Sequence, residues 1–183
     1  MIVYRLATKA DAPAVLSLLE EIMQHHGVVP PGRQRLSAVV SSIIAAKDHC
    51  FLLAESDQSD HAGEDGAAAG TETSSVGAAA PAAAAPGRIL GMCALIFTIS
   101  TWSAAPVCEL QDVIVTEDYR RTAVGQGLIA EAERIARAHC CARLFLLAEY
   151  WNLAGHAFYR SLGMQEKTSL YFERDLTSGA AAD

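Results

Sequence analysis

The sequence predicts an α/β fold in which helices flank a mixed, mostly antiparallel central sheet. Two kinds of segment indicate it: runs of strand length rich in β-branched and aromatic residues, and longer segments whose apolar residues recur every three or four positions, as on one face of a helix. Along the 183 residues these segments follow the order β-α-α-β-β-β-α-β-α-β. This order stacks helices on a sheet, and a chain of this length favours one domain.

The N-terminal segment predicts a strand followed by a capped helix. Residues 2–7 alternate between polar and apolar types, as in a half-buried strand. The next segment, 11–26, has the helical period. Thr8 offers an N-cap hydroxyl and Asp11 completes a capping box, whereas Gly27 is typical of a helix C-terminus.

The segment 57–87 differs in composition from the rest of the chain. It is rich in alanine and glycine and contains five acidic residues, no Lys or Arg and no large apolar side chain. Because such a segment cannot bury enough apolar surface to offset its ordering entropy, we expect a disordered insert at the tip between two antiparallel strands. A partner-binding segment is the alternative. The rest forms one expected domain, 1–176, with a frayed tail at 177–183.

The other elements follow from the same two patterns. A second helix is predicted over 36–47, and Trp102 lies in a predicted turn. The remaining strands are predicted at 50–55, 89–100, 108–115, 143–148 and, as one or two closing strands, 165–176; the remaining helices are predicted at 123–139 and 155–161.

Composition argues against several classes of protein. The net charge of −7 gives little support to nucleic-acid binding. There is no apolar run long enough to span a membrane and no signal-peptide layout, so we expect a soluble, cytoplasmic protein. The five cysteines are odd in number and lack C-x-x-C spacing, which predicts free thiols and no metal site.

The stretch 109–129 runs from a strand through a turn into a helix and is typical of an anion site. Gly125 and Gly127 lack a β-carbon, so a ligand can approach the backbone there. The first helical turn offers unpaired N–H groups and the positive end of the dipole, and Arg120 and Arg121 add full charges. A pyrophosphate would suit this combination. A helix start with two close-packed glycines and a solvated arginine pair is the alternative.

A second stretch makes the pattern specific. Residues 144–164 read L-F-L-L-A-E-Y-W-N-L-A-G-H-A-F-Y-R-S-L-G-M. With the preceding loop, the chain resembles the GNAT superfamily of acyl-CoA-dependent N-acetyltransferases, and within it the diamine acetyltransferases most. Arg120 and Gly125 match the family loop Arg/Gln-x-x-Gly-x-Gly/Ala, Ala123 stands where its first glycine is usual, and Gly127 follows two residues after the loop motif. The family's W-N-x-x-A-x-x-F-Y-x-x-x-G-F motif is matched by Trp151, Asn152, Phe158, Tyr159 and Gly163.

The resemblance implies acetyl-CoA as co-substrate and a GNAT-like fold. The loop would hold the pyrophosphate, the pantetheine arm would run along the strand before it, and a backbone N–H near Val113 would polarise the thioester carbonyl. The residues that the resemblance places at the cofactor are Val113, Ile114, Val115, Arg120, Arg121, Thr122, Ala123, Val124, Gly125, Gln126, Gly127, Asn152 and Tyr159.

Two side chains are the candidate catalytic residues. Tyr159 matches the family's general acid, which protonates the leaving thiolate; a core aromatic beside Phe158 is the alternative. The diamine enzymes carry a Glu-Asp pair on the central strand, and here Gln111 and Asp112 stand in its place. Because glutamine cannot accept a proton, we expect Glu109, two residues earlier on the same strand face, to be the base; Glu149 is a second candidate and Asp112 is expected on the opposite face.

The implied reaction is acetyl transfer from acetyl-CoA to a primary amine of a small molecule by direct attack. Acetylation of a protein or peptide, or a module that binds CoA without turnover, are the alternatives. The resemblance also leaves a homodimer open.

Overall fold

The computed structural model describes residues 1–57, 87–174 and 176. The chain forms two compact units, Met1–Leu147 and Ala148–Asp183, and each is described by itself. The predicted insert at 57–87, apart from its first and last residues, and the predicted tail at 177–183 lie outside the described residues.

The first unit is built on a five-stranded sheet with the order β1-β2-β3-β4-β5. Successive strands pair antiparallel except for β4 and β5, which are parallel. The predicted mixed, mostly antiparallel sheet is therefore confirmed. The strands are β1 (Ile2–Leu6), β2 (His49–Ser56), β3 (Ile89–Ser100), β4 (Ala105–Val115) and β5 (Leu144–Leu146).

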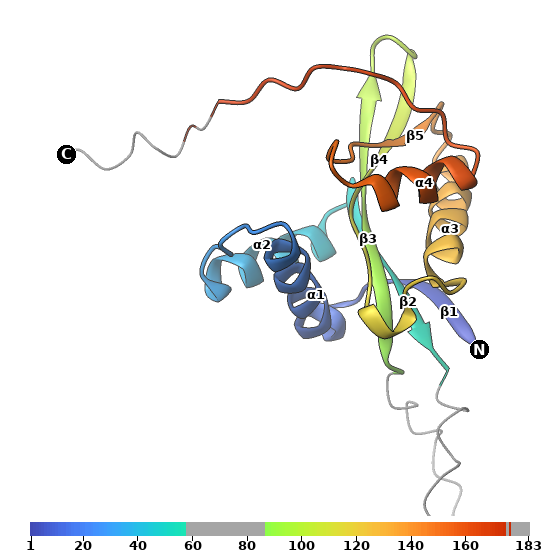
Figure 1. Cartoon of the computed structure of the whole chain (residues 1–183). Coiled ribbons are helices and arrows are strands. Elements are labelled where there is room, and N and C mark those ends of the chain that lie inside the picture. The colour runs from blue at the N-terminus through green and yellow to red at the C-terminus, as the bar shows by residue number, and fades with distance from the viewer. Residues whose placement is uncertain (58–86, 175, 177–183) are drawn as a thin grey trace, which may run out of the picture. The chain divides into compact units, whose positions relative to one another are not determined.

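Helices cover both faces of this sheet. α1 and α2 lie on one face and α3 on the other (Figure 1). The elements are the 3-10 turn η1 (Lys9–Asp11), α1 (Ala12–His25), α2 (Arg33–Ala45), the 3-10 turn η3 (Glu117–Tyr119) and α3 (Val124–Ala138). Within the described part of the chain, no helix is both long and apolar enough to cross a membrane.

The main core lies between the sheet and the pair α1 and α2. The apolar stripe predicted on α1 is buried there, and each fully buried Leu or Val contributes about 1.5–3 kcal/mol relative to exposure. The buried members of this core are Val15, Leu16, Leu18, Leu19, Leu36, Val40, Phe51, Leu53, Met92, Ala94 and Ile114.

The second unit contains α4 (Leu153–Ser161), and the closing strands predicted at 165–176 are wrong. Residues 165–174 have no strand assignment. A strand exists through its ladder of backbone hydrogen bonds, and the described residues of this segment take part in no strand pairing. β-propensity alone therefore gave a false prediction.

An ionic cluster joins β1, η1 and β2 at the N-terminal end of α1. Asp11 is buried, with 7% of its surface exposed, and its two carboxylate oxygens each accept a 2.8 Å hydrogen bond from the Arg5 guanidinium. The backbone N–H of Thr8 donates to the same carboxylate at 2.7 Å, so the predicted capping box is confirmed. Arg5 also pairs with Glu55. The hydrogen bonds from Arg5, followed by those from Thr8, hold the pKa of Asp11 well below its usual range.

Close packing of α3 on β1 involves a glycine. A β-carbon on Gly127 would lie 1.8 Å from the hydroxyl oxygen and 2.1 Å from Cζ of Tyr4. The Tyr4 hydroxyl donates to the carbonyl of Val124 at 3.4 Å. The phenol of Tyr4 therefore occupies the space that a side chain at position 127 would need.

We predict that Asp11→Asn destabilises the protein by about 1.5–3 kcal/mol at pH 7, because it removes charge-assisted hydrogen bonds between the buried carboxylate and Arg5 and leaves Arg5 paired with Glu55 alone. A carboxyl with a lowered pKa contributes stability above its unfolded pKa and loses it as the pH falls through its folded pKa. The difference between the two proteins in urea unfolding should therefore shrink below about pH 4. The control is Asp48→Asn, which removes an exposed carboxylate paired with His49. A loss that does not change with pH would contradict the ionic role.

We predict that Gly127→Ala destabilises the protein by about 2 kcal/mol through overpacking against Tyr4. In a Tyr4→Ala background the same change should be neutral or stabilising, because Ala favours a helix over Gly by about 1 kcal/mol. Urea unfolding of the four proteins measures this coupling. Gly32→Ala is the control, since nothing lies within 4 Å of a β-carbon built there. Equal costs in both backgrounds would refute the packing role.

Candidate functional site

A β-bulge interrupts β4 near its end. Ala94 of β3 pairs with Gln111 and Met92 pairs with Ile114, so one residue of β3 faces two of β4, Asp112 and Val113. Asp112 has a φ of 50°, in the left-handed region. A bulge of this kind bends the strand and shifts its side chains by one position.

The bulge exchanges the two faces of β4. Leu110 lies opposite Leu95, whereas Ile114 lies opposite Met92. Met92 and Ile114 belong to the core under α1 and α2, and Leu95 points to the other face because its neighbour Ala94 is in that core. Leu110 and Ile114 would share a face in a regular strand, so the alternation that predicts the side-chain directions fails at the bulge.

The same point is where β4 and β5 part. The parallel pairing covers Cys108 to Leu110 of β4 and ends at the pair Leu110 and Leu146. From Gln111 to Val115 the edge of β4 opposite β3 has no strand neighbour among the described residues of this unit. Backbone N–H and C=O groups on this edge can therefore pair with an extended ligand along the residues predicted for the pantetheine arm, Val113, Ile114 and Val115. The carbonyl of Val115 already accepts a hydrogen bond from Arg120.

The two polar residues before the bulge lie on one face, as predicted. The side-chain amide of Gln111 donates a 2.9 Å hydrogen bond to the carboxylate of Glu109. Gln111 lies opposite Ala94 and therefore on the face of α1 and α2. This hydrogen bond orients the carboxylate of the predicted base.

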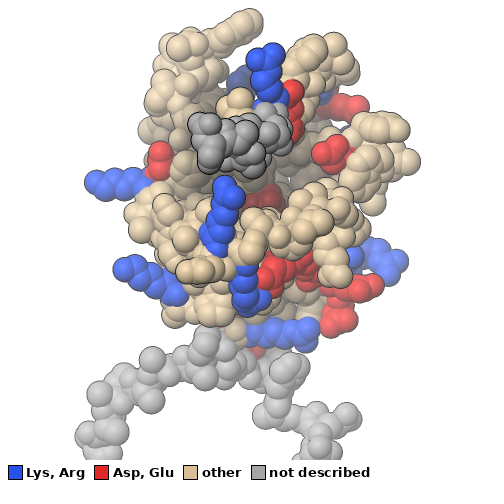
Figure 2. Space-filling model, turned by 90° about the vertical axis from the view of Figure 1, so that its left-hand side faces the viewer, with Lys and Arg blue, Asp and Glu red and all other residues tan. Residues whose placement is uncertain are grey.

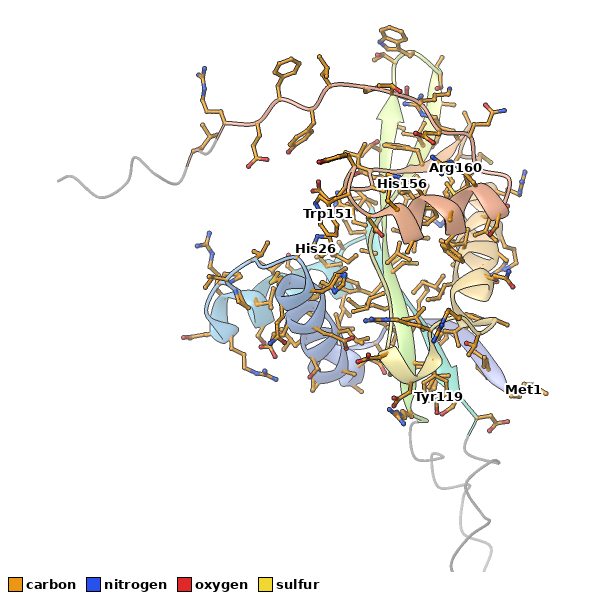
Figure 3. All side chains as sticks on the ribbon, viewed as in Figure 1. Met1, His26, Tyr119, Trp151, His156 and Arg160 are labelled. Carbon is orange, nitrogen blue, oxygen red and sulfur yellow. The ribbon has the colours of Figure 1, made fainter. Side chains whose placement is uncertain are left out.

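Asp112 has a left-handed backbone, at which the regular alternation of strand side chains does not hold. Burial raises the pKa of the Asp112 carboxyl, and the electrostatic effect of His26 partly opposes this rise. His26 caps the C-terminus of α1 (Figure 3). Asp112 is therefore a half-buried carboxyl within electrostatic range of the helix that covers the face of Glu109 and Gln111, a placement that strand periodicity could not reveal.

The predicted anion loop connects β4 to α3 through η3. Ala123 is the N-cap of α3 and no side chain caps the helix. The hydroxyl of Thr122 donates to the carbonyl of Tyr119 at 2.6 Å and accepts a long 3.4 Å bond from the N–H of Val124. The next two N–H groups, of Gly125 and Gln126, belong to the first turn and have no intrahelical partner. The start of α3 thus presents N–H groups and the positive end of its dipole.

The two arginines of the loop differ in their surroundings. Arg120 pairs with Glu21 of α1. Arg121 is exposed and has a left-handed backbone with a φ of 61°. Both carry the positive charge predicted for an anion site. Of the two loop glycines, Gly127 has a packing reason for its missing side chain, since Tyr4 fills that space.

The remaining predicted residues belong to the second unit. Asn152 is the N-cap of α4, and its side-chain oxygen accepts a 2.9 Å bond from the N–H of Gly155. On the same helix the ring of Tyr159 lies tilted against Phe158, with 5.2 Å between centroids. His156 and Arg160 lie one turn apart on α4 (Figure 3). Tyr159 and Asn152 are thus on one helix, whereas Glu109, Val113 and the loop belong to the first unit.

Charges of both signs are interspersed on the face that Figure 2 shows, which is the left-hand side of Figure 1. No large patch of one sign covers the described residues of this face. This distribution suits a site that receives its ligand through local contacts more than one that attracts a polyanion through a broad field.

Comparison with known proteins identifies relatives. The chain is 30% identical over 89 residues to a thialysine N-epsilon-acetyltransferase of Bos taurus, a match that covers 46% of this chain and 52% of the relative. It is 29% identical over 73 residues to an aminoglycoside N(6')-acetyltransferase type 1 of Acinetobacter baumannii, covering 39% and 50%. The matches thus span about half the length of these curated relatives.

Solved structures share the fold. AAC(6')-Iy in complex with the bisubstrate analog CoA-S-monomethyl-acetylneamine superposes with a TM-score of 0.71 at 16% identity, over 96% of this chain and 98% of that one. A Trypanosoma brucei acetyltransferase superposes with a TM-score of 0.65 at 19% identity, over 96% and 100%. The sequence model of the acetyltransferase (GNAT) family matches residues 41–164, which is more than half of the chain and includes the bulge, the loop and all of α4. The protein belongs to the GNAT acetyltransferase family.

Proposed function

We propose that this protein transfers an acetyl group from acetyl-CoA to a primary amine of a small molecule by direct attack. The observation that carries the proposal is the continuity of the stretch from Gln111 to Gly127. An open strand edge beyond the bulge leads directly into an uncapped helix N-terminus flanked by two arginines. The first part suits an extended amide-containing arm and the second a pyrophosphate, and acetyl-CoA contains both in the same order.

The relatives support this choice of co-substrate and acceptor. The AAC(6')-Iy structure contains a CoA-linked bisubstrate analog, and the two curated relatives are named for acetyl transfer to amino groups of small molecules, thialysine and aminoglycosides. We infer a small-molecule amine as acceptor on this basis, and a cytoplasmic location on the sequence alone.

The proposed chemistry divides among three groups of the chain. The Glu109 carboxylate takes a proton from the incoming ammonium, so that the amine lone pair can form the new C–N bond. The backbone N–H groups exposed at the bulge, around Val113, stabilise the negative charge that develops on the carbonyl oxygen. As the C–S bond breaks, the Tyr159 hydroxyl gives its proton to the thiolate, and the second proton that the nitrogen loses on becoming an amide passes to water. A phenol can do this because its ordinary pKa of about 10 still leaves it protonated at neutral pH.

Asp112 has a supporting part in this proposal. Its half-buried carboxyl lies at the bulge, next to the edge proposed for the acetyl-bearing arm. A negative charge there favours the approach of a cationic amine, whereas burial raises the pKa of the Asp112 carboxyl and so disfavours this charge. An acceptor ammonium would supply the missing positive partner.

The experiment that tests the function measures thiol release from acetyl-CoA with a panel of small polyamines and aminoglycosides and an unstructured lysine peptide. Acetyl transfer to one or more small amines is expected. Transfer to the peptide alone would make the protein a peptide acetyltransferase, and cofactor binding without any transfer would make it a CoA-binding module.

We predict that Tyr159→Phe lowers kcat by about 10²- to 10⁴-fold, because a positioned proton donor is lost. The Michaelis constant for acetyl-CoA should change little, since the ring and its contact with Phe158 are kept. Tyr171→Phe, a change outside α4, is the matched control. A Tyr159 variant within about threefold of the wild-type kcat would end the assignment of the acid.

We predict that Glu109→Gln lowers kcat by about 10²- to 10⁴-fold and removes the acidic limb of the pH–rate profile. Asp112→Asn should instead raise the Michaelis constant for the amine. It should also stabilise the fold at pH 7, because a carboxyl with a raised pKa contributes its stability below its unfolded pKa and loses it as the pH rises through its folded pKa. This gain in urea unfolding should disappear in acid. If Asp112→Asn removes the acidic limb and Glu109→Gln does not, Asp112 is the base.

A further inference from the structure

The side chain of Arg120 is held by groups from two elements. Its Nη2 lies 3.2 Å from Oε1 of Glu21 on α1, and its Nε donates to the carbonyl of Val115, at the end of β4, at 3.0 Å. Its backbone N–H donates to the carbonyl of Glu117 at 3.2 Å. Arg120 therefore links α1, η3 and the end of β4.

Arg121 is in the opposite situation. No carboxylate or carbonyl of the described residues accepts a hydrogen bond from its guanidinium, and the residue is exposed at a φ of 61°. A residue with a β-carbon in this conformation costs about 1 kcal/mol relative to an ordinary backbone. The uncommitted cation next to the start of α3 is therefore Arg121, and Arg120 is engaged elsewhere.

Side-chain packing does not close the space between α1 and the strand ends. A cleft of about 450 Å³ lies there, lined by Ala14, Ser17, Leu18 and Glu21 of α1 and by Ile89 and Thr116, among others. Where packing leaves a gap, a polar contact has a larger share in fixing the distance between the two walls. The pair Glu21 and Arg120 is such a contact, and it joins α1 to the residue from which the loop continues.

We propose that Glu21 is a positioning residue for the cofactor loop. By holding Arg120 against the Val115 carbonyl, it fixes the start of the loop, so that Arg121 and the N–H groups of the first turn of α3 are set for the pyrophosphate before it binds. The inference rests on the proposed function, and it assigns Arg120 to the protein's own structure and Arg121 to the ligand. The alternative is that Arg120 itself binds the pyrophosphate, in which case Glu21 would compete with the pyrophosphate for Arg120.

The test compares Glu21→Gln with Glu20→Gln. Glu20 is the adjacent residue of α1 and pairs with Arg33, so the control removes the same charge without touching Arg120. An exposed ion pair contributes up to about 1 kcal/mol, so Glu21→Gln should raise the dissociation constant of acetyl-CoA by about three- to fivefold. The kcat should stay unchanged, and Glu20→Gln should bind as the wild type does.

A second comparison shows whether the effect passes through Arg120. In an Arg120→Gln background, Glu21→Gln should cause no further loss of affinity. Calorimetric titration with acetyl-CoA measures the four proteins, and thermal unfolding without ligand confirms that each is folded. Unchanged or tighter binding in Glu21→Gln, or additive losses in the double variant, would overturn the inference. If the wild type does not bind acetyl-CoA, the proposed function fails and the inference fails with it.

Discussion

The feature on which the site depends is the extra residue in β4. If side chains alternated regularly from Ala105 to Val115, Leu110 and Ile114 would lie on one face of the sheet. One of the two would then be unable to pack in the core in which it is now buried. The bulge at Asp112 and Val113 lets Leu110 face α3 and Ile114 face α1 and α2. The left-handed backbone of Asp112 costs about 1–2 kcal/mol. The burial of both apolar residues offsets it, at about 1.5–3 kcal/mol for each side chain.

The open edge beyond the bulge follows from the same distortion. A bulge bends its strand and increases the local twist, and the parallel partner β5 pairs with β4 only as far as Leu110. The backbone groups freed from Gln111 onward then lead into the uncapped start of α3. One backbone irregularity thus produces both the strand edge and the approach to the helix dipole that the proposed function uses.

α1 connects this region to the rest of the first unit. Its N-terminal Asp11 is tied to β1 through Arg5, its middle is buried in the main core, and Glu21 reaches the loop through Arg120. At its end His26 acts electrostatically on Asp112. A displacement of this helix would therefore change contacts at the loop and the electrostatic environment of the bulge together.

Periodicity and turn chemistry were sufficient for the order of the elements from β1 to α4, but not for the segment after α4 or for the details on which the chemistry depends. The strand at Ile89–Ser100 and the helix that carries Gly125 have strong local signals. The bulge has no local signal, because it turns Leu110 and Ile114 to opposite faces of the sheet. The residues that pack on each face come from distant parts of the sequence. The strands expected at 165–176 rested on β-propensity, and the described residues of this segment pair with no other strand. In the same way, the motif marks Arg120 as the family's arginine, whereas its contacts with Glu21 and Val115 commit its guanidinium to the fold. A motif fixes the position of a residue along the chain. Which groups the side chain contacts depends on the acceptors that the fold brings near it. For Arg120 these are the carboxylate of Glu21, 99 residues earlier on α1, and the carbonyl of Val115, five residues earlier on β4.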